Sequence, residues 1–299
     1  MHLPRLAYYQ ATDRATAIEA LQSSASSAVL AGGLSLIPEL RSRHKSATLL
    51  VDITRIPELA QTRSPADDDP ACPVAVGAAV RLAEVLTAID SWHEHQLLRE
   101  ALGSVGTWLV RTQATAGGIL GQANPAGQLA AVCAVLDAEI AISGGYGTRV
   151  VKAGEQFAGR GCGPGELITE LRFPGLSADE GWSFDMCRRR SFRAIVGGVA
   201  ARVRLGAGMT CRSGRVAPFT AGHDGTAIAA VAEFLDGRAI DEQAAVAAGR
   251  IATDAVATRD DHLATAEYRR HMVGVMVERA LLIAAQRAVR IRATGGEIG

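Results

Sequence analysis

Two short glycine-rich stretches hold the residues with the clearest chemical potential in this chain. The first, residues 31–38, reads A-G-G-L-S-L-I-P, and the second, residues 115–118, reads T-A-G-G. Adjacent glycines allow a tight turn and let backbone N–H groups approach a ligand that side chains would block. Converging N–H groups of this kind suit a phosphate. We therefore expect a ligand with two phosphates, or one long ligand held at two places.

The first stretch needs particular elements on either side of it. Residues 29–31 predict the end of a buried strand, and Pro38 predicts the first turn of a short helix that continues to Arg41. Proline suits a first turn because the N–H that it lacks would have no partner there. A strand, a glycine turn and a helix start would direct several N–H donors to one point.

Common nucleotide-binding motifs are absent from the sequence. The nearest match to G-x-G-x-x-G is Gly206-Ala207-Gly208, which has Cys211 where the third glycine should stand. No G-x-x-x-x-G-K-[ST] string occurs. Phosphate binding therefore requires a different architecture.

Motifs for metal binding or acid–base catalysis are also weak. The five cysteines have no C-x-x-C spacing, so we expect no iron–sulfur cluster or zinc in this chain. His93-Glu94-His95 lacks H-E-x-x-H spacing and is more typical of an exposed connection, and no serine lies in a G-x-S-x-G elbow. Arg188-Arg189-Arg190 could bind phosphate or an acidic partner, or pair with carboxylates. We expect no catalytic residue and no metal ligand.

Composition restricts the class of protein. With 299 residues, 48% hydrophobic and 21% charged, the chain is large enough for two globular domains. Basic and acidic residues are equal at 31 each, which gives no electrostatic reason to expect nucleic acid. No apolar run approaches the roughly 20 residues of a membrane span, and the first residues do not resemble a secretory signal. An odd number of cysteines then favours the cytoplasm.

The pattern of the chain predicts an N-terminal α/β region followed by an α+β domain. We expect domains at 1–175, with lobes of about 1–60 and 61–175, and at 176–299. In the first domain the predicted helices are 14–22, 81–90, 97–109 and one that Asn124 caps and Pro125 begins, and the predicted strands are 28–31, 49–53, 74–77, 138–142, 149–152 and 166–173. In the second, strands are predicted near 183–187, 199–205 and 215–220, and helices at 241–257 and 265–289.

Two further expectations concern side chains. The acidic run Asp67-Asp68-Asp69 is typical of a solvated loop. On the last helix, Met272, Val275, Met276 and Ile283 are predicted to form the buried face, with Arg269, Arg270 and Glu278 outside.

Several motifs together resemble one known family, the FAD-binding medium subunits of bacterial molybdenum hydroxylases, which include carbon monoxide dehydrogenase and the flavin part of xanthine dehydrogenase. The family motifs A-G-G-x-S-L-[LI]-P, D-I-x-x-[IV]-x-E-L, R-x-x-x-T-[IV]-G-G, P-G-E-L-I-x-E-[IL]-x-[FI]-P and Y-R-x-x-[ML] resemble residues 31–38, 52–59, 111–118, 164–174 and 268–272. The match runs in register over almost the whole chain.

The resemblance implies a fold and a set of cofactor-binding residues. The implied fold is α+β: a two-lobed FAD-binding domain of the vanillyl-alcohol-oxidase (PCMH) type, followed by a small α+β C-terminal domain. The residues implied to bind FAD are Ala31, Gly32, Gly33, Leu34, Ser35, Leu36, Thr115, Ala116, Gly117, Gly118, Ile119, Asn124, Gln128 and Leu167. Leu34 and Ile119 stand where the family is often polar, and Asn124 and Gln128 stand where carboxylates are usual.

The resemblance also implies a function. A molybdenum large subunit would hydroxylate the substrate, an iron–sulfur small subunit would relay electrons, and FAD on this chain would collect them for an external acceptor. The expected assembly is a cytoplasmic dimer of heterotrimers. Two alternatives remain open at this point: a subunit of the same fold that lacks FAD and serves assembly, and a freestanding flavin oxidase.

Overall fold

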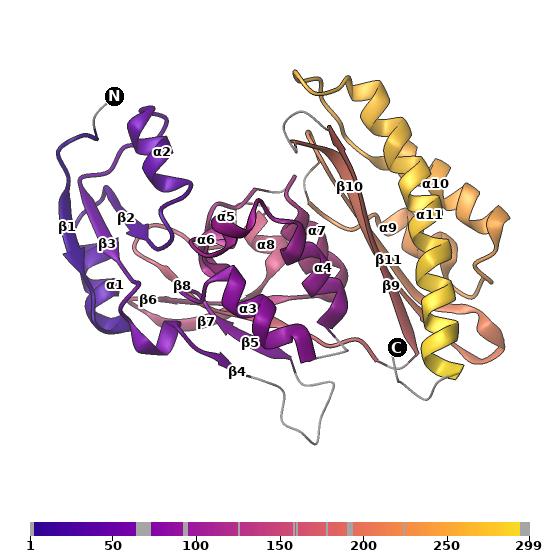
Figure 1. Cartoon of the computed structure of the whole chain (residues 1–299), viewed down its shortest axis with the longest axis horizontal. Helices are drawn as coiled ribbons and strands as arrows, with labels where there is room; N and C mark the ends of the chain where they lie inside the picture. Colours follow the sequence, from indigo (N-terminus) through magenta and orange to yellow (C-terminus); the bar gives the residue numbers. More distant parts are fainter. Residues whose placement is uncertain are drawn as a thin grey trace. The chain divides into compact units, whose positions relative to one another are not determined.

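The structure is a computed structural model that describes residues 3–63, 73–91, 95–124, 126–157, 159, 161–177, 179–189, 194–223 and 225–293 (Figure 1). The chain forms two compact units. The first consists of Met1–Ser91, Leu102–Ala123 and Ala138–Phe173, and the second of Trp92–Ala101, Asn124–Asp137 and Pro174–Gly299. The polypeptide therefore leaves the first unit and returns to it twice before it ends in the second.

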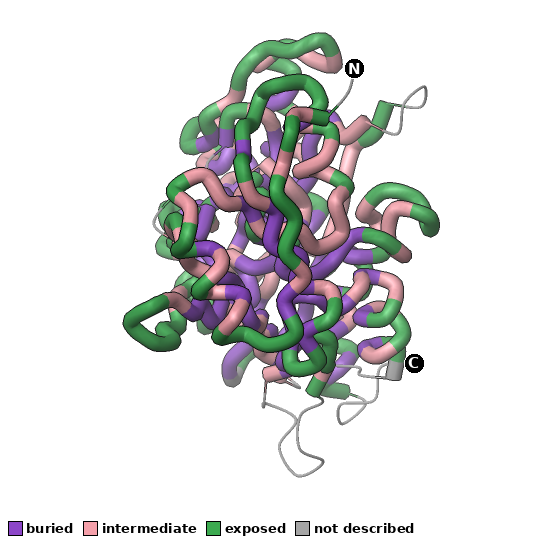
Figure 2. The backbone as a smooth tube through the Cα atoms, turned by 90° about the vertical axis from the view of Figure 1, so that its left-hand side faces the viewer, coloured by how far each residue is buried: buried purple, intermediate pink, exposed green. Residues whose placement is uncertain are grey.

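The first unit begins with a small parallel sheet. Its elements are β1 (Ala7–Gln10), α1 (Arg14–Gln22), β2 (Ser27–Leu30), α2 (Leu36–Arg41), β3 (Leu49–Asp52) and the 3-10 turn η1 (Pro57–Leu59), with strand order β1-β3-β2. Asp13 caps α1 by accepting a hydrogen bond from Thr16 N–H at 2.9 Å, as N-terminal caps do. In this sheet the strand β1 is mostly exposed and β3 is mostly buried, and Figure 2 colours the chain by this burial.

A five-stranded antiparallel sheet makes up the rest of the first unit. Its strands are β4 (Thr62–Arg63), β5 (Val74–Gly77), β6 (Glu139–Gly144), β7 (Gly147–Lys152) and β8 (Leu167–Phe173), in the order β4-β5-β8-β6-β7. The helices of this part are α3 (Leu82–Ala88), η2 (Ile89–Ser91), α5 (Trp108–Arg111), α6 (Ala116–Gly121) and α8 (Ala153–Phe157). A shared core that includes Leu21, Val51 and Leu167 joins this sheet to the parallel one.

The single helix predicted over 97–109 is wrong. The structure has α4 (Gln96–Ser104), a break, and then α5. Gly106 lies in the break with φ 53°, a left-handed conformation that ends a helix. The Arg111 guanidinium donates hydrogen bonds to the carbonyl oxygens of Gly103 and Val105 at 3.1 and 3.0 Å, which satisfies carbonyls at the end of α4. Arg111 of the R-x-x-x-T motif therefore has a structural role.

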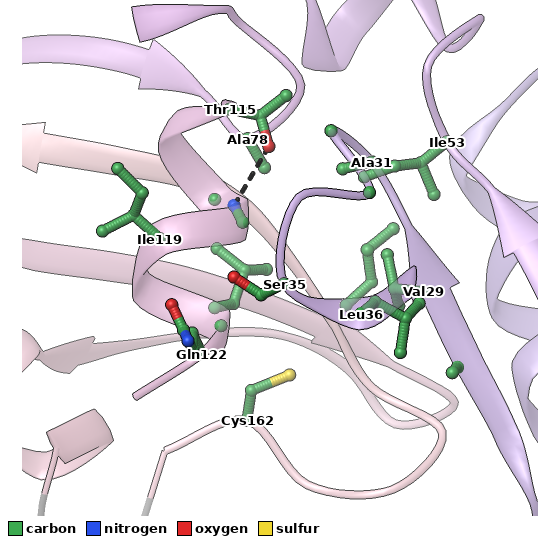
Figure 3. A pocket seen from close by; sticks show the side chains of 18 of the residues that line it. Val29, Ala31, Ser35, Leu36, Ile53, Ala78, Thr115, Ile119, Gln122 and Cys162 are labelled. Carbon is green, nitrogen blue, oxygen red and sulfur yellow. Dashed lines mark hydrogen bonds between the residues drawn. The ribbon is translucent and has the colours of Figure 1, made fainter. Parts of the chain in front are cut away.

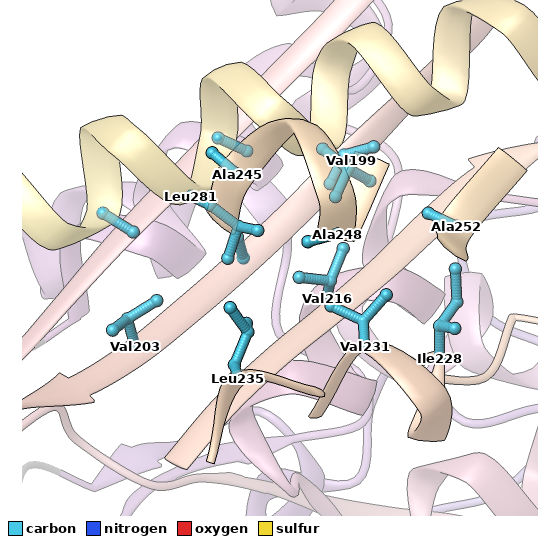
Figure 4. Packing of buried hydrophobic residues seen from close by; sticks show 14 of the residues in the cluster. Val199, Val203, Val216, Ile228, Val231, Leu235, Ala245, Ala248, Ala252 and Leu281 are labelled. Carbon is cyan, nitrogen blue, oxygen red and sulfur yellow. The ribbon is translucent and has the colours of Figure 1, made fainter. Parts of the chain in front are cut away.

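The second unit contains a three-stranded antiparallel sheet covered by helices. It comprises β9 (Glu180–Arg189), β10 (Ala194–Leu205), the 3-10 turn η4 (Ala207–Met209), β11 (Cys211–Thr220), α9 (Ala229–Leu235), α10 (Glu242–Ala255) and α11 (Ala266–Ala293), with strand order β11-β10-β9. Val203, Val216, Ala248 and Leu281 are among the buried residues that join sheet and helices in one core (Figure 4). The buried alanines on α10 are small, so this helix can pack closely against the rest of the core.

Helix α7 (Gln128–Leu136) also belongs to the second unit and begins later than predicted. Asn124 is not its cap: the Asn124 side-chain oxygen accepts from Ala126 N–H at 3.1 Å, which makes a turn before the helix. Gly127 occupies the cap position. At the other end of α7, Arg202 donates to the Val135 carbonyl at 3.4 Å, which places a cation where the helix dipole is negative.

The buried face of α11 differs from the predicted one. Met276 is buried, but Ile283 is 40% exposed and Arg269 is only 2% exposed. Arg269 pairs with Asp261 and donates to the Val196 carbonyl, so a charged side chain occupies a core position because partners surround it. The true face passes through Val273, Val277, Ala280, Leu281, Ala284 and Ala288.

Several predictions fall on residues outside the described ones. These are the acidic run Asp67–Asp69, Cys72, His93 and Glu94, Pro125, and Arg190. In the described residues, no group of three or more His, Cys, Asp or Glu side chains has a geometry that could hold a metal ion. None of the described helices has the length and apolar character needed to cross a membrane.

Candidate FAD site

A cavity of about 350 Å³ opens in the first unit between the two glycine loops (Figure 3). Its volume lies within the range of about 300–1,000 Å³ typical of ligand and cofactor sites. Three backbone segments form most of the lining: the first glycine loop after β2, the second glycine loop with α6, and the loop that precedes β8. Glycines at seven lining positions leave much of the wall as bare backbone: Gly32, Gly33, Gly117, Gly118, Gly121, Gly163 and Gly165.

The first glycine loop lines the cavity and has backbone donors without a partner in the described part of the chain. Ile37 N–H donates to the Gly33 carbonyl at 3.2 Å, which begins α2, and Pro38 lies in the first turn as predicted. Within the described residues, the N–H groups of Gly32, Leu34 and Ser35 have no protein acceptor. The Ser35 side chain makes no capping hydrogen bond, and Figure 3 shows it extending from the loop towards α6.

Gly32 brings the first loop close to the segment before the second. A Cβ atom at Gly32 would lie 2.3 Å from the Gln113 carbonyl oxygen, so no larger residue fits without displacement of one backbone. Gly33 has φ 72°, which other residues rarely adopt. These two glycines therefore allow, respectively, the close approach of the two loops and the turn of the first one.

The second glycine loop uses its backbone donors within the protein. Ala116 N–H donates to the Val80 carbonyl and Gly117 N–H to the Ala78 carbonyl, both at 2.9 Å. Thr115 caps α6, since its side-chain oxygen accepts from Gly118 N–H at 3.2 Å (Figure 3). This loop therefore presents surface and shape to the cavity rather than a set of available N–H groups.

Gly117 also has a packing role. A Cβ atom there would lie 2.5 Å from the Ala78 Cβ and 2.9 Å from the Ala78 carbonyl oxygen. Gly117 is therefore explained by the close contact of α6 with the residues after β5, whereas a Cβ atom at Gly118 would lie 2.7 Å from the hydroxyl oxygen of the cap residue Thr115.

The loop before β8 forms the third wall. Glu166 accepts hydrogen bonds from Gly163 N–H and from the Arg149 guanidinium, each at 2.8 Å. Burial acts to raise the pKa of Glu166, but these two hydrogen bonds hold it below its ordinary value. Burial, with a smaller effect from the Glu166 charge, raises the pKa of the Cys162 thiol to about 11. Near neutral pH this wall therefore presents a carboxylate paired with Arg149 and a protonated thiol.

The structure gathers most of the predicted site residues and separates a few. The predicted residues that line the cavity are Ala31, Gly32, Gly33, Leu34, Ser35, Leu36, Thr115, Gly117, Gly118, Ile119 and Leu167. Ala116 lies in the second loop but not in the lining, and Asn124 and Gln128 belong to the second unit.

Some lining residues were not predicted from the sequence. Cys162 and Glu166 lie next to or within the P-G-E-L-I motif, which could have signalled them. Glu39 and Lys45 come from α2 and the segment after it, and no motif marks them.

A small parallel sheet and a larger antiparallel sheet carry the loops of this cavity, whose glycine-rich backbone suits a ligand with phosphates. Residues 4–176 match the family model described as "FAD binding domain in molybdopterin dehydrogenase". Residues 182–284 match the one described as "CO dehydrogenase flavoprotein C-terminal domain". The chain therefore belongs to the family of FAD-binding medium subunits of molybdenum hydroxylases, which are oxidoreductases.

Individual relatives agree with this membership. The chain is 30% identical over 263 residues to the 6-hydroxypseudooxynicotine dehydrogenase complex subunit alpha of Paenarthrobacter nicotinovorans, covering 87% of each chain. It is 31% identical over 269 residues to the caffeine dehydrogenase subunit beta of Pseudomonas sp. strain CBB1, covering 88% of this chain and 89% of that one.

A solved structure supports the fold. A chain of the carbon monoxide dehydrogenase of Hydrogenophaga pseudoflava superposes with a TM-score of 0.87 at 28% identity, covering 96% of this chain and 99% of that one. The predicted fold, an FAD-binding domain followed by a flavoprotein C-terminal domain, is thereby confirmed.

Proposed function

We propose that this chain is the electron-transfer subunit of a heteromeric molybdenum hydroxylase and passes electrons from a partner's iron–sulfur clusters through FAD to an external acceptor. The observation that carries the proposal is the cavity whose first glycine loop has available N–H donors, in a chain whose fold belongs to this family. The sequence predicts no acid–base constellation, which fits such a role because the cofactor supplies the redox chemistry.

The residues of the cavity suit FAD in their donors and in their shape. N–H groups of Gly32, Leu34 and Ser35, together with the Ser35 hydroxyl, would bind the diphosphate. Ile119 and Leu167 line the cavity with apolar side chains, which suit the aromatic parts of the cofactor. Asn124 and Gln128, which the sequence predicts as further FAD contacts, remain proposed ligands of the cofactor.

When bound, FAD would accept single electrons and deliver them in pairs. The chain's own residues would position the cofactor and limit the entry of water. Among the described residues of the third wall, Glu166 is paired with Arg149 and the Cys162 thiol is protonated near neutral pH, so neither side chain is an activated nucleophile.

The proposed partners are an iron–sulfur small subunit and a molybdenum large subunit in a dimer of heterotrimers in the cytoplasm. The relatives support a multi-subunit setting, since their names describe subunits of dehydrogenase complexes. No partner of nucleic acid is proposed for a chain with 31 basic and 31 acidic residues.

The test is purification of the complex from its native source, followed by flavin absorbance and identification of co-purifying chains. We expect a flavin spectrum and partner chains with cysteine-rich cluster motifs. A colourless protein that cannot be reconstituted with FAD would instead support the assembly subunit, and a stable monomer with flavin would support a freestanding oxidase.

A further inference from the structure

We propose that Lys45 supplies the positive charge for the cofactor's diphosphate in this chain. The inference rests on the proposed function, because it concerns FAD in the cavity already described. No motif of the chain marks Lys45 as a binding residue.

The charge of the cavity supports this role of Lys45. Among the described residues, the lining has only three carboxylate or amine side chains, which are those of Glu39, Lys45 and Glu166. Glu166 is already paired with Arg149 at 2.8 Å. A diphosphate carries two negative charges, and uncharged N–H donors alone would leave those charges without a counter-charge. Lys45 is the one lining cation among the described residues.

The Lys45 ammonium is also available for a ligand. Within the described residues it has no carboxylate within ion-pair distance, although Glu39 lies in the same lining. The other lysine of the chain, Lys152, is paired with Glu139 at 2.9 Å and lies outside the lining. An ammonium on a flexible stem is a common phosphate ligand, since it acts as a point charge from several positions.

The path of the chain after α2 brings Lys45 to the cavity. Helix α2 follows directly from the first glycine loop and ends at Arg41. Arg43 then has φ 63°, which reverses the chain, and the N–H groups of His44 and Lys45 both donate to the Glu39 carbonyl, at 3.0 and 3.3 Å. This reversal holds Lys45 against α2, which is the helix that follows the N–H donors of the first glycine loop. The loop and the lysine therefore form parts of one local structure.

The experiment compares FAD binding by the full-length apo-subunit and its variants, followed by quenching of flavin fluorescence. We expect K45Q to raise the Kd about three- to tenfold at low ionic strength, since an exposed ion pair has a modest effect. K45R keeps the charge and should stay within about twofold of the wild type. K152Q is the matched control and should leave the Kd unchanged. E39Q removes an opposing charge and should lower the Kd.

Two readouts separate this role from a structural one. The difference between wild type and K45Q should shrink as salt is raised, because the interaction is screened. Acetylation with an N-hydroxysuccinimide ester, read by mass spectrometry, should be slowed by FAD at Lys45 and not at Lys152. Equal Kd values for wild type and K45Q, or equal acetylation of Lys45 with and without FAD, overturn the inference alone. Failure of the wild type to bind FAD overturns the proposed function as well.

Discussion

The two glycine loops look alike in sequence and differ in what their backbones do. In the first loop the N–H groups of Gly32, Leu34 and Ser35 have no acceptor among the described residues. In the second, the N–H groups of Ala116 and Gly117 are bonded to the residues that follow β5. The first loop therefore has backbone donors available for the proposed ligand, and the second uses its donors to hold α6 in place. A G-G pair by itself does not distinguish these roles.

Their cap residues differ in the same way. Thr115 is 1% exposed and caps α6, whereas the Ser35 hydroxyl makes no capping hydrogen bond to α2. A hydroxyl at the start of a helix can thus be used by the helix or left for a ligand. Substitutions in the two loops should consequently affect stability and FAD binding to different extents.

The largest expected effect is that of Gly117→Ala on stability. The added methyl group would lie 2.5 Å from the Ala78 Cβ, and such overpacking costs about 1–3 kcal/mol in the free energy of unfolding. Gly154→Ala is the control, because no atom lies within 4 Å of the place that its Cβ would occupy. Urea unfolding of the apo-protein measures both. Equal midpoints for G117A and the wild type would contradict the packing role.

The next effect is the loss of the α6 cap in Thr115→Ala. Removal of a capping hydroxyl costs about 1 kcal/mol of stability. Thr115→Ser keeps the oxygen that accepts from Gly118 N–H and should recover most of the loss. Thermal and urea unfolding measure the three proteins. If serine and alanine are equally destabilising, the methyl group rather than the cap is what matters.

Ser35→Ala should show the opposite balance. Its stability should stay within about 0.5 kcal/mol of the wild type, because the side chain makes no capping bond. Its FAD affinity should fall by about 1 kcal/mol, which is the usual value of one hydrogen bond. Parallel unfolding and FAD titrations test this. A clear loss of stability with unchanged affinity would remove the distinction between the two loops.

The smallest effect concerns the third wall and pH. Because the folded-state pKa of Glu166 is lowered, its contribution to stability is present above its unfolded-state pKa and is lost as the pH falls through the folded value. Glu166→Gln should therefore be less stable than the wild type near neutral pH, and the difference should shrink between about pH 5 and pH 3. Unfolding curves at several pH values measure it, and a constant difference would contradict the sign.

Much of the fold could be predicted from sequence because local patterns agree with it. The helix 14–22 and the strand Val74–Gly77 were predicted with the bounds that the structure has. The errors occur where tertiary contacts override local signals. Arg269 is charged yet buried, because Asp261 and the Val196 carbonyl lie beside it. Asn124 has the chemistry of a cap but forms a turn before α7.

The candidate site shows the same limit. The residues of both glycine loops were predicted because their spacing is local, and so was Leu167 from its motif. Lys45 was missed because only the reversal at Arg43 brings the segment after α2 back to this helix. Glu39 lies on α2 itself, where no motif marks it. Whether an N–H group is available also depends on partners distant in sequence, such as Ala78 and Val80.

The membership of α7 in the second unit limits how this protein can be divided. Residues 124–137 come from the middle of the chain, yet α7 packs on β10 and β11, and Arg202 and Arg215 donate to its last carbonyls. A gene fragment ending after residue 175 would encode α7 without the strands and arginines that support it. The two halves are thus poor modules for recombination, and a swap between relatives would have to exchange α7 together with the C-terminal sheet.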